Sequence, residues 1–441
     1  MTKIPKLAVT VLLAAALFGV GAVGVFRAQR TDATPVTATR GGTEGTRAAT
    51  GQLGDSIAAL EARVEAVPGD WQAMASLGLA YVQQARVTAD PSYYPKAQGI
   101  LEASLRSHPQ DNEGALVGMA ALAAARHDFA AALRFGLRAR RVNPYDGNVY
   151  GVIGDAQVEL GRYDEAFETF QRMVDTEPGV ASYARVSYAR EIRGDVAGAI
   201  EAMTAAREIA GTRADEAWAS FQLGELWWNS GRVARAAQAY RFGVQADPDY
   251  VPNLAGLAKI AWARGDLDAA IAGYEEVVRR FPSPEHVTAL GDLYALVGQE
   301  DAAQRQYDLV RAEADLFRAA GVDTDLELAL FDADHGSPRT ALRAARAEWD
   351  RRHSIHVADA LAWALHANGN DTEAATYADR ALALGTRNAL FVYHAGMIRL
   401  GLGDRAGARE LLAEALRINP RFSILYSAEA SSTLRRLGGA A

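Results

Sequence analysis

The sequence predicts an all-α repeat protein, because three landmark residues keep one register along most of its 441 residues. A glycine, an alanine five residues later and a proline 12 residues after the alanine recur together. Glycine suits the positive φ at a helix end and proline stops a helix, so each period holds two helices. The alanine recurs at intervals of 33–38 residues: Ala97, Ala132, Ala166, Ala199, Ala236, Ala270, Ala303, Ala341, Ala374 and Ala408.

Composition and charge restrict the possible functions. Hydrophobic residues make up 49% and charged residues 23% of the chain, which is typical of a folded protein. A net charge of −8 argues against a broad nucleic-acid-binding surface. The absence of cysteine excludes disulfides, thiolate zinc ligands and cysteine nucleophiles. Because the catalytic motifs G-x-S-x-G, H-E-x-x-H and the P-loop are also missing, we expect neither an enzyme nor a cofactor.

The first segment, residues 1–30, is predicted to direct the chain to a membrane. Residues 7–26 are a run of 20 positions without charge, bordered by two lysines and two arginines. A helix of that length spans about 30 Å, the thickness of the hydrocarbon core. The alternative is a cleaved signal peptide, with Val20 and Ala22 as the small residues before the cut. Both interpretations place the body of the protein outside the cytoplasm, either anchored to the membrane or secreted.

A spacer and a half repeat follow. Residues 31–54 are rich in threonine, glycine and alanine and have no apolar period, which predicts a flexible linker. Ile57, Leu60 and Val64 then make one apolar helical stripe before Pro68, as in the second half of a repeat.

The repeat resembles a known family. The stretch LGRYDEAFETFQRMVDTEP, residues 160–178, closely resembles the second half of a tetratricopeptide repeat. The resemblance covers about residues 71–420 as ten repeats, and residues 421–437 look like a capping helix. It implies a right-handed superhelical solenoid of antiparallel helix pairs, with a concave inner groove. The predicted type is a bacterial membrane-anchored or secreted protein.

The repeat pattern is least regular around residues 311–341. The spacing of the landmark alanines stretches there to 38 residues and the proline is missing. We therefore expect an overlong helix, and a boundary between an N-terminal block (55–313) and a C-terminal block (314–441).

The resemblance places the inner groove on the first helix of each pair. In the fourth to sixth repeats the matching positions hold large aromatic and charged side chains, which suit a protein or peptide ligand. The alternative is that the tryptophans simply pack between helices. The candidate groove residues are Tyr188, Glu191, Trp218, Phe221, Glu225, Trp228, Asn229, Lys259 and Trp262.

Histidine is concentrated near the C-terminus, where five of the eight fall within residues 335–394. Nitrogen ligands with a carboxylate could bind a divalent metal, and the candidates are His356, Asp359 and His394. No two histidines are four apart on one helix, so scattered polar side chains are the simpler interpretation. The sequence therefore favours a scaffold that holds a protein in its groove, with a small-ligand or metal-binding protein as the alternative.

Overall fold

The computed structural model describes residues 45–439, in which all regular structure is helical and forms 22 helices. The predicted membrane segment and most of the predicted linker lie outside these residues. None of the described helices is long and apolar enough to cross a membrane.

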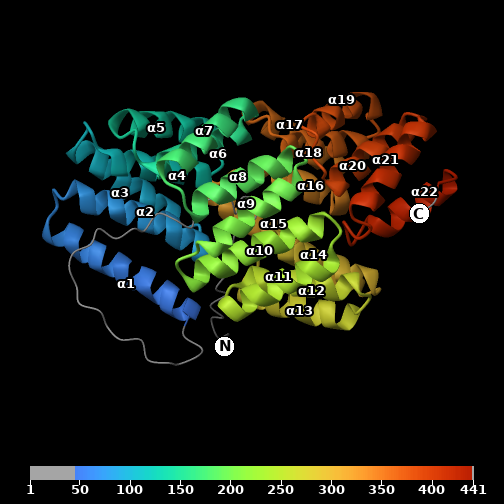
Figure 1. Cartoon of the computed structure of the whole chain (residues 1–441), viewed down its shortest axis with the longest axis horizontal. Helices are drawn as coiled ribbons and strands as arrows, with labels where there is room; N and C mark the ends of the chain where they lie inside the picture. The colour runs from blue at the N-terminus through green and yellow to red at the C-terminus, as the bar shows by residue number, and fades with distance from the viewer. Residues whose placement is uncertain (1–44, 440–441) are drawn as a thin grey trace, which may run out of the picture.

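The described helices form ten consecutive pairs, with one further helix at each end (Figure 1). The end helices are α1 (Gly45–Ala66) and α22 (Ser427–Arg436). The first helices of the pairs are α2 (Trp71–Thr88), α4 (Glu113–Ala125), α6 (Gly147–Glu159), α8 (Val180–Ile192), α10 (Arg213–Asn229), α12 (Val251–Ala263), α14 (Pro284–Leu296), α16 (Asp325–His335), α18 (Ile355–Ala367) and α20 (Ala389–Gly401). The second helices are α3 (Tyr93–Ser107), α5 (Phe129–Val142), α7 (Tyr163–Thr176), α9 (Val196–Glu208), α11 (Val233–Ala246), α13 (Leu267–Arg280), α15 (Glu300–Ala319), α17 (Pro338–Arg351), α19 (Asp371–Leu382) and α21 (Arg405–Ile418).

The landmark alanines lie where the two helices of a pair cross. All ten are buried, with at most 1% of their surface exposed, which confirms the predicted register. The first helix contributes a small residue at the same crossing. A Cβ on Gly154 would overlap the ring of Phe170, and a Cβ on Gly224 would overlap the ring of Tyr240. The small residues therefore let each pair approach closely enough for one large ring to fill the space between them.

The turn inside most pairs depends on a left-handed residue. Seven of the eight predicted glycines have φ between 72° and 83°. The exception is Gly336, for which the prediction was wrong: its φ is −133°, because α16 ends there with an extended residue before Pro338. In the first two pairs Ala89 and His127 adopt the left-handed conformation instead, with φ of 53° and 63°.

The pairs wind into a superhelix whose inner side is formed by first helices. Most neighbouring first helices, such as α2 with α4 and α10 with α12, contact each other. The second helices contact mainly the first helices before and after them, so they form the outer side.

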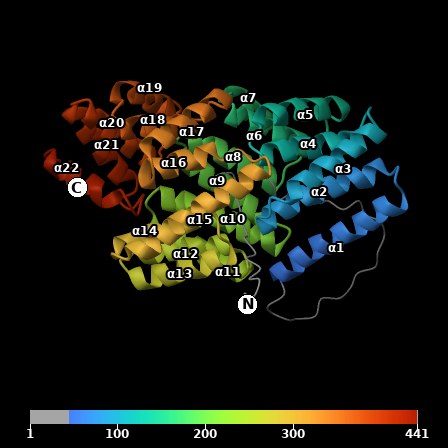
Figure 2. The same cartoon turned by 180° about the vertical axis from the view of Figure 1, so that it is seen from behind.

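Successive turns of this superhelix touch (Figures 1 and 2). Four hydrogen bonds that involve a side chain connect residues separated by a nearly constant 196, 193, 192 and 191 positions. They include Arg352 to Glu159 and the backbone N–H of Ile355 to the hydroxyl of Tyr163. A constant separation means that the second turn runs parallel to the first. We call this contact the seam.

The predicted overlong helix is α15, which has 20 residues. It continues through positions 313 and 314, so the predicted division between the two blocks falls inside a helix. Its C-terminal end reaches back to the first repeat, where Phe317 packs in one cluster with Leu77 and Leu101.

Candidate functional site

Four charged side chains come together on consecutive first helices, and we call them the acidic inner surface: Glu191, Glu225, Lys259 and Glu285. The carboxylate of Glu225 on α10 accepts hydrogen bonds from Lys259 Nζ on α12, at 2.7 and 2.8 Å. The Tyr240 hydroxyl of α11 donates to the same carboxylate at 2.5 Å. Glu225 is thus held in place by two neighbouring elements.

The remaining carboxylates extend this surface to both sides. Asn229 on α10 donates to Glu191 on α8 across 3.2 Å, and burial raises the pKa of Glu191. Glu285 in the first turn of α14 is exposed, yet surrounding protein raises its pKa to about 7, and the nearby Glu225 charge adds to this rise. The surface carries three carboxylates and one ammonium group, so it favours a positively charged partner group.

Sequence reasoning found Glu191, Glu225, Asn229 and Lys259 but missed Glu285. The candidates were taken from the fourth to sixth repeats, whereas Glu285 begins the first helix of the seventh. Its position beside Pro284 at a helix start was the available signal.

The three candidate tryptophans are buried. Trp218, Trp228 and Trp262 have 6%, 5% and 8% of their surface exposed, and each belongs to an apolar cluster between helices. The rings of Trp228 and Trp262 lie 6.1 Å apart, and Lys259 Nζ lies 5.0 Å from the Trp228 ring. The three tryptophans therefore pack between helices, as the alternative interpretation of the sequence expected. Partner binding by the rings stays a prediction.

The other two candidate aromatics are partly buried. Phe221 packs between Tyr240 and Tyr250, with 6.2 Å between ring centroids in both cases. Tyr188 packs with Tyr163 and Phe167, and burial raises its pKa well above the ordinary value.

An ion pair lies beside this surface on the preceding repeats. Arg185 donates from Nε and Nη2 to the two oxygens of Asp155, at 2.8 and 2.7 Å. Only 3% of the Arg185 side chain is exposed, so this pair fixes the relative position of α6 and α8. Sequence reasoning did not select Arg185 because nothing in its spacing separates it from the other arginines.

The candidate metal ligands are only partly brought together. His394 Nδ1 lies 3.0 Å from both oxygens of Asp359, and both residues are buried. His394 also stacks on Trp363, with 4.1 Å between ring centroids. Burial lowers the pKa of His356 to about 4, and its ring packs edge-on against Phe391. In the described part of the chain these three residues do not form a set of three convergent ligands.

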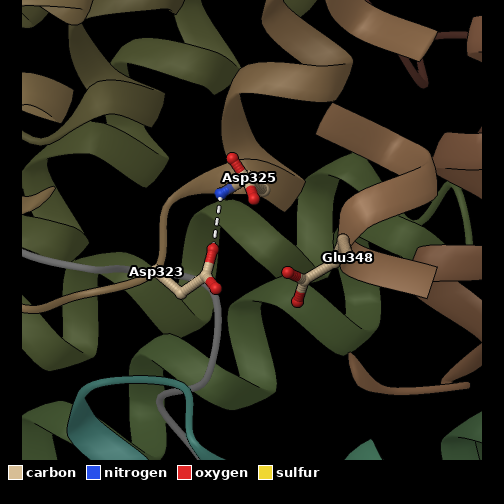
Figure 3. Close-up of side chains that lie close together, drawn as sticks. All are labelled: Asp323, Asp325 and Glu348. Carbon is tan, nitrogen blue, oxygen red and sulfur yellow. Dashed lines mark hydrogen bonds between the residues drawn. The ribbon is translucent and has the colours of Figure 1, made fainter. Parts of the chain in front are cut away.

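A different acidic cluster does have the spacing of a metal site (Figure 3). Ligand oxygens of Asp323, Asp325 and Glu348 lie within 4.8 Å of one another. Arg351 binds all three, with distances of 2.6, 2.6 and 2.5 Å. These carboxylates raise the pKa of Arg351, and its guanidinium neutralises much of their charge. The arginine thus fills the position that a cation would need.

Two family models decide which repeat this is. Models described as tetratricopeptide repeat match residues 117–181 and 228–293. The chain is a tetratricopeptide-repeat protein. Tetratricopeptide repeats serve as scaffolds for protein–protein interaction, and this chain carries ten such pairs around an inner surface.

A curated relative matches part of this tetratricopeptide-repeat chain. Cellulose synthase 1 operon protein C from Komagataeibacter xylinus is 27% identical over 209 residues, which cover 45% of this chain. The chain spans only 15% of the length of that relative.

Solved tetratricopeptide-repeat structures are similar at a low level. The Cut9–Hcn1 hetero-tetramer of the APC/C matches 84% of this chain and 77% of its own chain, with 15% identity and a TM-score of 0.39. PilF from Pseudomonas aeruginosa matches 47% of this chain and 90% of its own, with 17% identity and a TM-score of 0.37. These values are too low to indicate a shared function.

Proposed function

We propose that this tetratricopeptide-repeat protein is an extracytoplasmic scaffold that binds a protein segment carrying lysine or arginine on its acidic inner surface. The observation that supports this most is the arrangement of Glu191, Glu225 and Glu285 on α8, α10 and α14, three of the four consecutive first helices that form this surface. A basic side chain entering there would gain charge-assisted hydrogen bonds and relieve the repulsion between carboxylates.

The surface is built to recognise charge without large rearrangement. Glu225 is oriented by Lys259 and Tyr240, and Glu191 is oriented by Asn229, so little entropy is lost when a ligand binds them. The buried tryptophans beneath this surface hold α10 and α12 together. In this proposal they support the surface and the carboxylates contact the partner.

The test is a charge reversal with a matched control. Partners are captured by crosslinking from cells that carry the full chain, and the bound segment is identified by mass spectrometry. Glu285→Lys should lower capture about tenfold or more, at roughly 1.4 kcal/mol per tenfold. Glu168→Lys makes the same charge change on an exposed position of the second helix α7 and should leave capture unchanged. Equal capture by both variants would refute a role for the acidic inner surface.

The location is a separate part of the proposal and rests on the uncharged run 7–26. A reporter that is active only in the cytoplasm, fused after residue 60, should be inactive. An active fusion would contradict an extracytoplasmic body and would leave the acidic inner surface untouched.

The relative from the cellulose synthase operon does not extend the proposal, because the match covers a small part of that protein. A metal-binding function is not favoured by the geometry either. Arg351 binds the acidic cluster, and His356 and His394 each pack against an aromatic ring.

A further inference from the structure

Each of the two end helices of the described region corresponds to one half of a helix pair. α1 packs on α2, just as the second helix of each pair packs on the first helix of the next pair. Among the described residues, no first helix precedes α1. α22 packs on α21 as a first helix does, through Ala430 and Leu434. No second helix follows it in the part that the structure describes.

The face of α1 that would meet a first helix is exposed. Ser56 stands 12 residues before Pro68, which is the landmark position of a second helix. The ten alanines at that position in the repeats are at most 1% exposed, whereas Ser56 is solvent-exposed, and so is Ala59 one turn later. Both residues are small, as the close crossing of a helix pair requires.

The end of α22 carries the matching turn. Gly438 follows this helix with φ of 79°, and Gly403 follows α20 with φ of 80° in the tenth pair. A chain leaving α22 through this turn would be directed into a second helix. First helices carry an apolar residue followed by a small one, as at Leu290 and Gly291 on α14. On α22, Ala430 and Ser431 form the same kind of pair.

The seam shows how repeats of successive turns meet. The turn inside one pair touches the loop that follows the pair five repeats later. Cβ atoms on Gly161 and Gly231 would each lie 2.7 Å from a carbonyl oxygen, those of His353 and Ile418 respectively. A Cβ on Gly194 would lie still closer to the carbonyl of Gly385.

The later turns have no such neighbour. Gly265, Gly298, Gly369 and Gly403 have the same backbone conformation, but nothing lies within 4 Å of a Cβ built on them. They form one free edge of the superhelix. By the five-repeat offset of the seam, the loops after the early pairs form the other free edge.

Exposed apolar side chains mark both free edges. Of the nine large hydrophobic residues exposed in the described chain, three lie at turns of the first edge and three at loops of the second. These six are Leu296, Val297 and Leu402 on the first edge, and Val67, Tyr145 and Ile209 on the second. Ile418 also lies beside a loop, but one that the seam covers, and only 5% of its surface is exposed.

We propose that copies of this chain associate head to tail, so that α22 of one copy pairs with α1 of the next and the superhelix continues between copies. The joint would form an eleventh repeat, and the two free edges would meet as a new seam. A heterologous contact of this kind does not close and produces a filament. The five-repeat offset of the observed seam then sets the register: the turn at Leu402 meets the loop at Ile209 of the next copy.

This register can be tested by crosslinking because the chain has no cysteine. Full-length Leu402→Cys and Ile209→Cys proteins are purified separately, mixed and oxidised. We expect a disulfide-linked dimer in the mixture at a yield about tenfold above that of Leu402→Cys mixed with Glu168→Cys. Glu168 is also exposed but lies in the middle of the second helix α7, away from the turns and loops of both edges. Equal yields from the two mixtures, or no dimer in either, would overturn the proposal.

A second pair of variants tests the joint itself by sedimentation at increasing protein concentration. Ala59→Glu places a carboxylate on the face of α1 that meets α22 and should abolish association. Ala58→Glu makes the same change on a neighbouring exposed residue that points away from that face, and should associate like the native chain. A native chain that stays monomeric at all concentrations would refute the assembly. So would a lower melting temperature for Ala59→Glu alone with unchanged sedimentation, because α1 would then be paired within its own chain.

Discussion

Gly161 and Gly265 occupy the same turn in two repeats and have similar backbone conformations, with φ of 75° and 83°. Only Gly161 also touches the next superhelical turn, through the carbonyl of His353. Alanine at either position is strained by the positive φ, and at Gly161 its Cβ would also push the seam apart. We expect Gly161→Ala to lower the melting temperature clearly more than Gly265→Ala. Equal losses in thermal unfolding would mean that the close approach at Gly161 contributes nothing to stability.

Loss of Trp228 or Trp262 should lower the stability of the fold, whereas loss of a charge on the acidic inner surface should weaken partner binding. Because both rings are buried, truncation removes core contacts and leaves a cavity. Trp228→Ala or Trp262→Ala should each cost about 3–5 kcal/mol of unfolding free energy. The measurement is denaturant unfolding beside partner capture. Loss of partner capture without loss of stability would show that these rings contact the partner.

Residue patterns predicted some of these roles and not others. The alanine landmarks were predictable because a close helix crossing tolerates only small side chains, and this constraint repeats ten times. The burial of Trp228 was not predictable, since a first helix has both an inner and a packed face and the period alone does not separate them. Glu285 was missed for the related reason that its surface is assembled from four different helices.

At the scale of elements, α15 carries a carboxylate in an unusual position. Glu313 is fully buried and neither oxygen has a hydrogen-bond partner within the described structure. Burial raises its pKa from 4.5 to about 8. A group with a raised pKa in the folded state contributes stability that is lost as pH rises from the unfolded to the folded value. Docking of α15 should therefore weaken between about pH 4.5 and pH 8.

Glu313→Gln tests this element directly. The variant cannot ionise at this position, so it should be more stable than the native chain near pH 8 and similar to it near pH 5, measured by thermal unfolding at both values. Asp315→Asn neutralises an exposed carboxylate on the same helix and should show no such pH-dependent gain. The excess length of α15 was visible in the stretched repeat spacing. Its contact with the first repeat was not, because it joins segments more than 200 residues apart.

For the whole molecule, the seam is the feature that no repeat pattern could reveal. Each repeat by itself specifies only its contacts with its neighbours. The seam depends on how many repeats make one turn, and this number results from small rotations added over five pairs. It nonetheless contains a buried charge pair, since Arg352 is 1% exposed and donates to Glu159 at 2.8 Å and to Glu348.

Removing that arginine should separate the turns without unfolding the pairs. In Arg352→Met, Glu159 would remain buried without a cation, which costs about 3–5 kcal/mol when one partner of a buried pair is lost. Glu348 would keep its ion pair with Arg351. The local contacts inside each repeat are untouched, so the cheaper outcome is that the seam opens and the Glu159 carboxylate is hydrated. Solution scattering should then show a larger radius of gyration, while circular dichroism shows unchanged helix content.

The pH dependence of this opening has a definite sign, and an arginine on α17, the helix that ends just before Arg352, provides its control. Burial raises the pKa of Glu159 to about 7 despite the opposing effect of Arg352, so proton binding favours the closed seam. The expansion of Arg352→Met should be largest near pH 8 and smallest near pH 5, where the Glu159 carboxyl group is neutral. Arg346→Met removes an arginine from α17 that pairs with Glu373 at the exposed surface, and should not expand at either pH. An expansion that grows as pH falls, or one shared by Arg346→Met, would show that the Glu159–Arg352 pair does not hold the two turns together.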